Sequence, residues 1–132
     1  MDLPIEGGCL CGAVRYRITR PPRRAGYCHC RMCQKASGAP VVAFVSLPDG
    51  GFAITEGEPA EYRSSKNGLR GFCPRCGSQL TFVDPEASRG VAVNTATLDD
   101  PNAAPPDHHL WTSSQLSWLN LADDHTRYPE NG

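Results

Sequence analysis

Short runs of alternating apolar and polar residues, separated by glycine and proline, recur along the chain and predict β-strands. Val14, Tyr16 and Ile18 alternate with polar residues, which predicts a half-buried strand. Residues 41–45 are continuously apolar, which predicts a buried strand that ends at the turn formed by residues 48–51. Similar patterns predict further strands at residues 24–29, 52–54, 60–62, 69–72, 80–82, 91–93 and 109–111.

Helix is expected at only one place in this pattern. Residues 30–37 are compatible with one or two helical turns, and Gly38 is placed to end them. Residues 99–106 are expected to form an irregular loop with too few apolar side chains to pack, and the tail at 122–132 is expected to fray. Many short strands with little helix predict an all-β fold.

The composition predicts one small domain whose own core is modest. The chain has 132 residues, of which 39% are hydrophobic, with 13 glycines and 12 prolines. We therefore expect a single domain over residues 1–132, with its core at about 7–121. Because the apolar content is low, bound metal is expected to supply part of the stability.

Charge and hydropathy exclude several classes of partner. The formal net charge is −1, so we expect no general attraction to nucleic acid or to an anionic membrane. The longest apolar run is far too short to span a bilayer, and the first six residues lack the basic start and apolar segment of a signal peptide. We expect a cytoplasmic protein whose thiols stay reduced and free to bind metal.

Seven cysteines carry the strongest chemical signal, and their spacing is typical of metal ligands. They occur as Cys-x-Cys, Cys-x-Cys-x-x-Cys and Cys-x-x-Cys, at positions Cys9, Cys11, Cys28, Cys30, Cys33, Cys73 and Cys76. An odd number does not suit a complete disulfide framework. Seven divides naturally into one closed site of four ligands and one incomplete site of three.

The closed site is predicted to be structural. Cys73 and Cys76 flank a tight turn followed by Gly77, which has the form of a zinc knuckle and supplies two ligands. Cys9 and Cys11 lie two residues apart on one face of an extended segment and are the expected source of the other two. A zinc ion held by these four thiolates would join the N-terminal region to a hairpin more than sixty residues away.

The incomplete site is predicted to be the reaction centre. Three thiolates from Cys28, Cys30 and Cys33 would leave a fourth position on a second zinc ion, where a substrate thiol or carbonyl can bind. Such a site carries negative charge and needs donors nearby; the local candidates are His29, Arg31 and Lys35. His29 is predicted to be catalytic, either moving a proton or orienting a ligand, although a supporting role is an alternative.

Other interpretations compete with this hypothesis. The four cysteines can be buried without metal, and the three can be redox thiols or a structural site completed by His29 or His109. An iron–sulfur cluster is disfavoured by the spacing, and a nucleic-acid zinc ribbon by the charge. His109 is expected to be a packed strand residue near Trp111. Arg70 and Arg75, like the local cations, are expected to be surface charges unless they meet a substrate carboxylate.

Several motifs together resemble a known family. These are GCLCGAV at residues 8–14, CHCRMCQKASG at 28–38, FCPRCGS at 72–78 and PDHHLW at 106–111, with Trp118 beyond. Over residues 7–118 the chain resembles the glutathione-dependent formaldehyde-activating enzymes, which share their domain with centromere protein V. Two segments depart from the family pattern. Beyond Trp118, the family's usual Asp-Gly-Leu-Pro ending is replaced by residues 123–127. The basic residue that often lies shortly before that tryptophan is replaced by residues 113–115.

The resemblance implies a fold, a ligand set and a reaction. It implies a β-tent of small antiparallel sheets closed by zinc, with Cys9, Cys11, Cys73 and Cys76 on a structural ion and Cys28, Cys30 and Cys33 on a catalytic one. It also implies a carbon–sulfur lyase that joins formaldehyde to glutathione, giving S-hydroxymethylglutathione. A glutathione-like thiol and an aldehyde are therefore the expected partners. The alternative functions are a non-catalytic zinc module that binds a protein and a thiol redox or metal-buffering protein.

Overall fold

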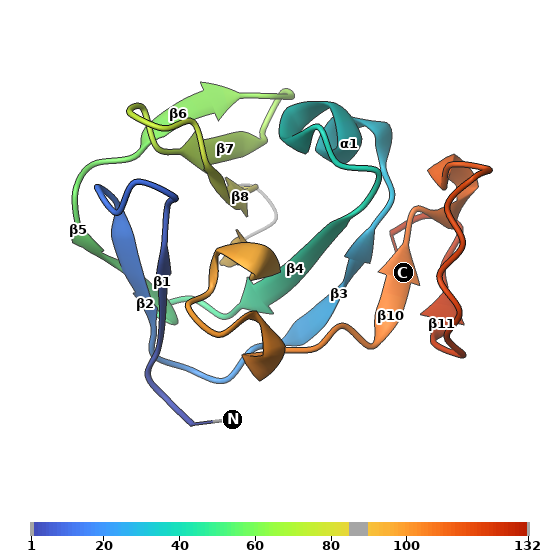
Figure 1. Cartoon of the computed structure of the whole chain (residues 1–132), viewed down its shortest axis with the longest axis horizontal. Coiled ribbons are helices and arrows are strands. Elements are labelled where there is room, and N and C mark those ends of the chain that lie inside the picture. The colour runs from blue at the N-terminus through green and yellow to red at the C-terminus, as the bar shows by residue number, and fades with distance from the viewer. Residues whose placement is uncertain (1, 85–89, 132) are drawn as a thin grey trace.

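Eleven short strands and one α-helix are the main regular elements of the described chain, which comprises residues 2–84 and 90–131 of a computed structural model (Figure 1). The strands are β1 (Ile5–Gly8), β2 (Arg15–Ile18), β3 (Arg24–Cys28), β4 (Val42–Leu47), β5 (Phe52–Glu56), β6 (Ala60–Arg63), β7 (Leu69–Phe72), β8 (Gln79–Val83), β9 (Val91–Asn94), β10 (His108–Leu110) and β11 (Thr126–Arg127). The helix is α1 (Arg31–Ser37), and short 3-10 helices are η2 (Thr95–Thr97), η3 (Pro101–Ala103) and η4 (Thr112–Ser114). The prediction of an all-β fold is confirmed, and strands β1 and β11 are additional to those expected.

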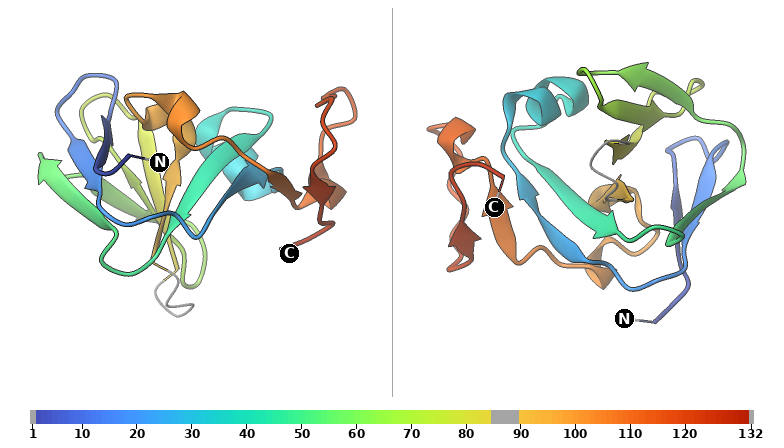
Figure 2. Two further views of the ribbon diagram at one scale, coloured as in Figure 1. Left: turned by 90° about the horizontal axis from the view of Figure 1, so that it is seen from below. Right: turned by 180° about the vertical axis from the view of Figure 1, so that it is seen from behind.

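The strands form two sheets among the described residues. The smaller sheet has the order β1-β2-β5 and is antiparallel throughout. The larger has the order β11-β10-β3-β4-β9-β8-β7-β6 and is antiparallel from β3 to β6. Strand β10 runs parallel to both β3 and β11, a pairing that the local sequence pattern did not indicate. In Figures 1 and 2 the smaller sheet and the β10–β11 arm lie at opposite sides of the molecule.

The main core lies where the smaller sheet meets the middle of the larger one. The predicted alternation is confirmed, because Val14, Tyr16 and Ile18 are almost completely buried. They belong to one apolar cluster with residues of β4, β8 and β9, among them Val45 and Leu80. Cys9 and Cys73 are part of the same cluster, so two of the predicted ligands lie inside the core.

The segment after η2 packs more closely than the sequence suggested. It was expected to be an irregular loop without packing, yet Ala104 is 2% exposed and belongs to the main core. The segment also contains η3 and is attached to β2 by the ion pair between Arg15 and Asp99. The expectation was wrong for this part because one small apolar side chain and one ion pair are sufficient to dock a short loop.

Helix α1 begins and ends at the predicted residues. Cys30 is its N-cap, with its Sγ accepting a hydrogen bond from the backbone N–H of Cys33 at 3.3 Å. Gly38 ends the helix in the left-handed conformation, φ 71°, and its N–H donates to the carbonyl of Gln34 at 2.8 Å. No helix within the described part of the chain has the length and apolar character needed to cross a membrane.

The C-terminal tail is bound to the sheet instead of frayed. Strand β11 pairs with β10, the N–H of Tyr128 donates to the carbonyl of His109 at 2.9 Å, and the N–H of Trp111 donates to the carbonyl of Glu130 at 3.0 Å. The sequence-based expectation is therefore not met, because backbone hydrogen bonds to β10 hold a segment that has few apolar side chains.

Candidate metal centres

Cys9, Cys11, Cys73 and Cys76 come together at one point. The first two follow β1 and the last two follow β7, and the four sulfur atoms all lie within 4.8 Å of one another. The Sγ atoms of Cys9 and Cys11 are 3.7 Å apart, and those of Cys11 and Cys73 are 3.8 Å apart. A tetrahedral zinc ion with Zn–S bonds of about 2.3 Å separates its sulfur ligands by about 3.8 Å. The donor set and its spacing therefore fit a closed zinc site.

Backbone and hydroxyl donors surround these sulfurs. Cys9 Sγ accepts from the N–H of Val14 at 3.2 Å, and Cys73 Sγ accepts from the amides of Arg75 and Cys76 at 3.4 and 3.5 Å. Gly77 follows the turn that Cys73 and Cys76 flank. Its φ of 81° is one that glycine adopts readily, and its N–H donates to the Cys73 carbonyl at 2.8 Å. Hydrogen bonds from the side chain and then the backbone of Ser78 lower the pKa of Cys76 to about 5.

Cys28, Cys30 and Cys33 form the second group. Cys28 ends β3, Cys30 caps α1, and Cys33 lies in the first turn of that helix. Because the strand leads directly into the helix, the three sulfur atoms lie within 4.8 Å of one another. All three residues are partly exposed, whereas Cys9 and Cys73 are buried. Without a fourth cysteine, this group can bind zinc and leave a position open to the solvent side.

The three thiols differ in acidity. Hydrogen bonds from Cys28 and Cys33 lower the pKa of Cys30 to about 2, and the backbone N–H of Cys33 and the charge of Arg70 act in the same direction. The hydrogen bond with Cys30 raises the pKa of Cys28, as do the hydrogen bond with Cys33 and burial. Because zinc binds cysteine as the thiolate, metal binding at this group displaces the remaining thiol protons.

Arg70 of β7 provides a positive charge at this second group. Its two terminal nitrogens lie 3.8 and 3.9 Å from Cys33 Sγ, and its guanidinium stacks over the ring of Phe82 at 4.9 Å from the centroid. The default expectation of a solvated surface charge does not describe this residue. Strand β7 thus holds Arg70 beside one cysteine group and leads directly to Cys73 of the other.

Replacing Arg70 with methionine is expected to weaken metal binding at the three-cysteine group. Methionine keeps an unbranched stem over Phe82 but removes the charge that stabilises the thiolate of Cys33. We expect an affinity loss of roughly threefold to tenfold, because a partly solvated charge contributes about 1 kcal/mol at this distance. Cobalt titration followed by thiolate-to-metal absorption would measure the change. Arg75→Met, at an exposed position of the knuckle, is the matched control, and equal effects of the two substitutions would contradict the assignment.

His29 does not join the sulfur atoms that flank it. Its side chain is completely buried, and its Nε2 lies 2.9 Å from Nδ1 of His109. Tyr27 and His29 occupy the strand face opposite to Cys28, and both stack against the His109 ring. The structure therefore places this predicted catalytic residue beside His109, which is itself buried, as expected of a packed strand residue. Arg31, another predicted donor, bonds to Gln34 at 2.6 Å.

Gln34 and Asp123 make contacts around this group that were not predicted from the sequence. Gln34 is buried within α1, and its Nε2 donates to the carbonyls of His29 at 2.8 Å and Ser114 at 3.3 Å. Asp123, in the tail, accepts from Nε2 of His109. A polar residue at a helix position facing the core was the only available signal for Gln34, and no local signal pointed to Asp123.

An open groove lies beside helix α1 and the knuckle. It has a volume of about 450 Å³, and its lining includes Ala36 and Val42 together with Ser78, Gln79 and Asn94. Ala36 lies one helical turn after Cys33, and Val42 pairs with Cys28 across β3 and β4. The groove therefore lies between the two groups: Cys76 of the first group lines it, and the elements that carry the second group form its opposite wall, although Cys28, Cys30 and Cys33 are not among its lining residues.

Comparison with known proteins agrees with this geometry. Residues 4–114 match the family model for the glutathione-dependent formaldehyde-activating enzyme. A Halomonas elongata protein that is provisionally named a glutathione-dependent formaldehyde-activating enzyme is 30% identical over 126 residues, covering 89% of this chain and 80% of that protein. A crystal structure of a Rhodobacter sphaeroides protein has the same fold, with a TM-score of 0.56 at 20% identity, covering 93% of this chain and 98% of the other. The chain belongs to the glutathione-dependent formaldehyde-activating enzyme family.

Proposed function

We propose that this protein joins a small glutathione-like thiol to an aldehyde such as formaldehyde and cleaves the same adduct in reverse, as a carbon–sulfur lyase. The observation that carries the proposal is the division of the cysteines. Four form a closed set, and Cys28, Cys30 and Cys33 form a partly exposed set that has no fourth ligand among residues 2–84 and 90–131. The family match and the name of the Halomonas elongata relative support the choice of glutathione and formaldehyde.

The proposed reaction is a balanced addition without an oxidant or a reductant. The thiol sulfur forms a bond to the aldehyde carbon, the carbonyl π bond breaks, and the proton of the thiol ends on the former carbonyl oxygen. The product is an S-hydroxymethyl thiol when the aldehyde is formaldehyde. A zinc ion held by the three cysteines would supply a Lewis-acid position that favours the thiolate form of the substrate.

The residues around this group have separate tasks in the proposal. Cys28, Cys30 and Cys33 hold the metal, and Arg70 offsets the negative charge that three thiolates create. The groove beside α1 is open enough to receive the backbone of a small peptide thiol. His29 supports the ligand segment from the opposite face of the strand. Holding the thiol and aldehyde in one place lowers the entropic barrier to their addition.

The proposal includes two zinc ions per chain, one in each cysteine group. The closed group is expected to hold its ion more tightly, because it has four ligands and two of them are buried. The exposed group is expected to exchange its ion more readily.

A cobalt-substituted sample tests whether a thiol reaches the second group. We expect glutathione at millimolar concentration to change the cobalt thiolate absorption, because a fourth sulfur completes the coordination sphere. S-methylglutathione, which has the same peptide but no thiol, is the control and is expected to leave the spectrum unchanged. Formaldehyde exchange measured by NMR would then report catalysis above the spontaneous rate. An unchanged spectrum with glutathione, and no acceleration, would favour the non-catalytic zinc module.

A further inference from the structure

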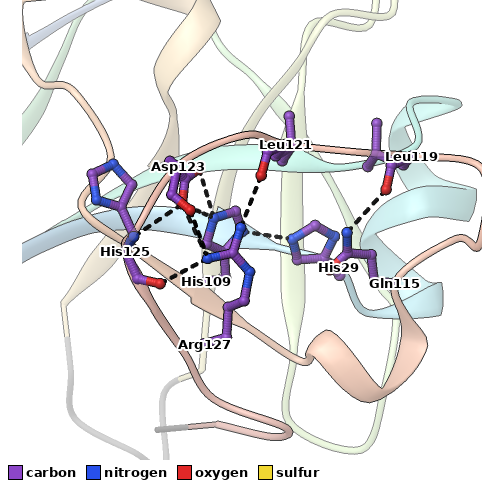
Figure 3. Close-up of polar contacts among 8 residues, drawn as sticks. All are labelled: His29, His109, Gln115, Leu119, Leu121, Asp123, His125 and Arg127. Atoms are coloured by element: carbon purple, nitrogen blue, oxygen red, sulfur yellow. Dashed lines mark hydrogen bonds and ion pairs between the residues drawn. The ribbon is translucent and has the colours of Figure 1, made fainter.

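A buried chain of hydrogen bonds joins the C-terminal tail to the second cysteine group. Both carboxylate oxygens of Asp123 lie close to Nε2 of His109, at 3.0 and 3.1 Å, and Nδ1 of His109 lies 2.9 Å from Nε2 of His29 (Figure 3). The two imidazole side chains are completely buried, and Asp123 is 21% exposed. This network uses residues from β10, from the tail and from the segment between Cys28 and Cys30.

The carboxylate determines where the ring protons lie. A carboxylate only accepts, so the proton of neutral His109 lies on Nε2, and its Nδ1 must accept from Nε2–H of His29. His29 Nδ1 is then left as a bare acceptor, and it is buried without a hydrogen-bond partner among the described residues.

The backbone of His29 is held by hydrogen bonds as well. In addition to its ring, its N–H donates to the carbonyl of Leu110 at 3.0 Å, and its carbonyl accepts from Gln34 at 2.8 Å. The neighbours of His29 in the sequence are two of the proposed metal ligands. The position of His29 therefore limits where the sulfur atoms of Cys28 and Cys30 can lie.

Asp123 is itself held in place by a closed loop in the tail. Its Oδ1 accepts from the N–H of His125 at 3.0 Å and forms an ion pair with Arg127 at 3.2 Å. Arg127 also donates to the carbonyls of Leu121 at 2.9 Å and His125 at 2.9 Å (Figure 3). Partial burial raises the pKa of Asp123, but the bonds from His109 and His125 and the charges around it hold that pKa below its usual value.

We propose that Asp123 is a positioning residue that acts through His109 and His29 to hold the Cys28–Cys33 segment in the geometry needed for a metal ion. This inference rests on the proposed function of that segment as a metal site. The tail is thus a third support for the cysteine group, in addition to β3 and α1.

The test compares Asp123→Ala with Asp124→Ala in the full chain. Asp124 is the adjacent carboxylate but is exposed, so it controls for the loss of one negative charge from the tail. We expect Asp123→Ala to lower cobalt affinity at the three-cysteine group by about tenfold. Removing a hydrogen-bond partner that supports metal ligands typically lowers metal affinity by about tenfold to 100-fold, and Asp123 acts through two intervening residues. Affinity at the four-cysteine group is expected to stay unchanged in both variants. Equal affinity of Asp123→Ala and the unaltered chain, or an equal loss at both groups, would overturn the proposal.

Two further measurements do not depend on the second metal. In the unaltered chain with one zinc equivalent, nitrogen NMR is expected to show the ring protons of His29 and His109 on Nε2. A proton on Nδ1 of His29 would overturn the proposed hydrogen-bond chain. This measurement uses no variant, so it stands even if Asp123→Ala fails to fold. In the same one-zinc state, amide exchange at residues 28–34 is expected to be faster in Asp123→Ala than in Asp124→Ala, and equal rates would contradict positioning. Faster exchange in a chain that binds no second cobalt ion would retain the positioning role while rejecting the proposed function.

Discussion

Replacing Cys73 with serine is expected to unfold or aggregate the protein. Its side chain is completely buried in the main core, and its sulfur accepts hydrogen bonds from two backbone amides of the knuckle. Structural zinc sites contribute about 10–16 kcal/mol of binding energy, whereas whole domains have stabilities of about 5–15 kcal/mol. Losing one of four thiolate ligands therefore removes a large part of the stability. Circular dichroism during thermal unfolding, with zinc content measured on the same sample, would check this.

The effect on stability should be specific to the metal site. Arg75→Ser changes the same turn at an exposed position and is expected to leave zinc content and thermal unfolding close to those of the unaltered chain. Recovery of Cys73→Ser as a folded, soluble protein would break the assignment of this group as the structural site, whatever its metal content.

Replacing Cys30 with serine is expected to leave the protein folded and to lower turnover strongly. Cys30 is partly exposed, and its structural role is to cap α1 by accepting from the N–H of Cys33. Serine is a good N-cap, so the helix should be retained while the thiolate is lost. We expect the metal content to fall by one ion per chain and the rate of thiol–formaldehyde addition to fall by roughly 100-fold, the upper end of losses from a disturbed metal site.

The control for this substitution is a change in the same helix that leaves the sulfurs in place. Lys35→Met alters an exposed residue one turn later and is expected to keep both metal ions and full turnover. If Cys30→Ser retained the second ion, the three-cysteine group would not be the metal site that the proposed reaction requires. If it lost the ion but kept turnover, the proposed reaction centre would be elsewhere.

Much of the local structure could be predicted from the sequence. The alternation of Val14, Tyr16 and Ile18 identified a buried strand, and Gly38 correctly marked the end of α1. Cysteine spacing predicted the two groups that the structure brings together. Strand periodicity, the helix C-terminal stop and the spacing within each cysteine motif were accessible because each depends on residues only a few positions apart. The pairing of Cys9 and Cys11 with Cys73 and Cys76 followed instead from the division of seven ligands into four and three.

Longer contacts were not accessible in this way. Arg70 lies beside Cys33 although the two residues are 37 positions apart in the sequence. Nothing in the residues next to Arg70 distinguishes it from an ordinary surface arginine. The tail was expected to fray, yet β10 supplies backbone partners for it and Asp123 accepts a hydrogen bond from His109. An ion pair or a buried hydrogen bond requires only one correctly placed partner, so it leaves no repeated pattern in the sequence.

The sequence by itself determined most of the strands, the helix with its C-terminal stop and the grouping of the cysteines, because these depend on local periodicity and on the number and spacing of thiolate ligands. Only the tertiary structure decided which charges and histidines surround the second group. It placed β10 parallel to β3, which brings His109 between His29 and Asp123. That placement depends on how distant segments share one sheet, and no local physical preference of the chain specifies it.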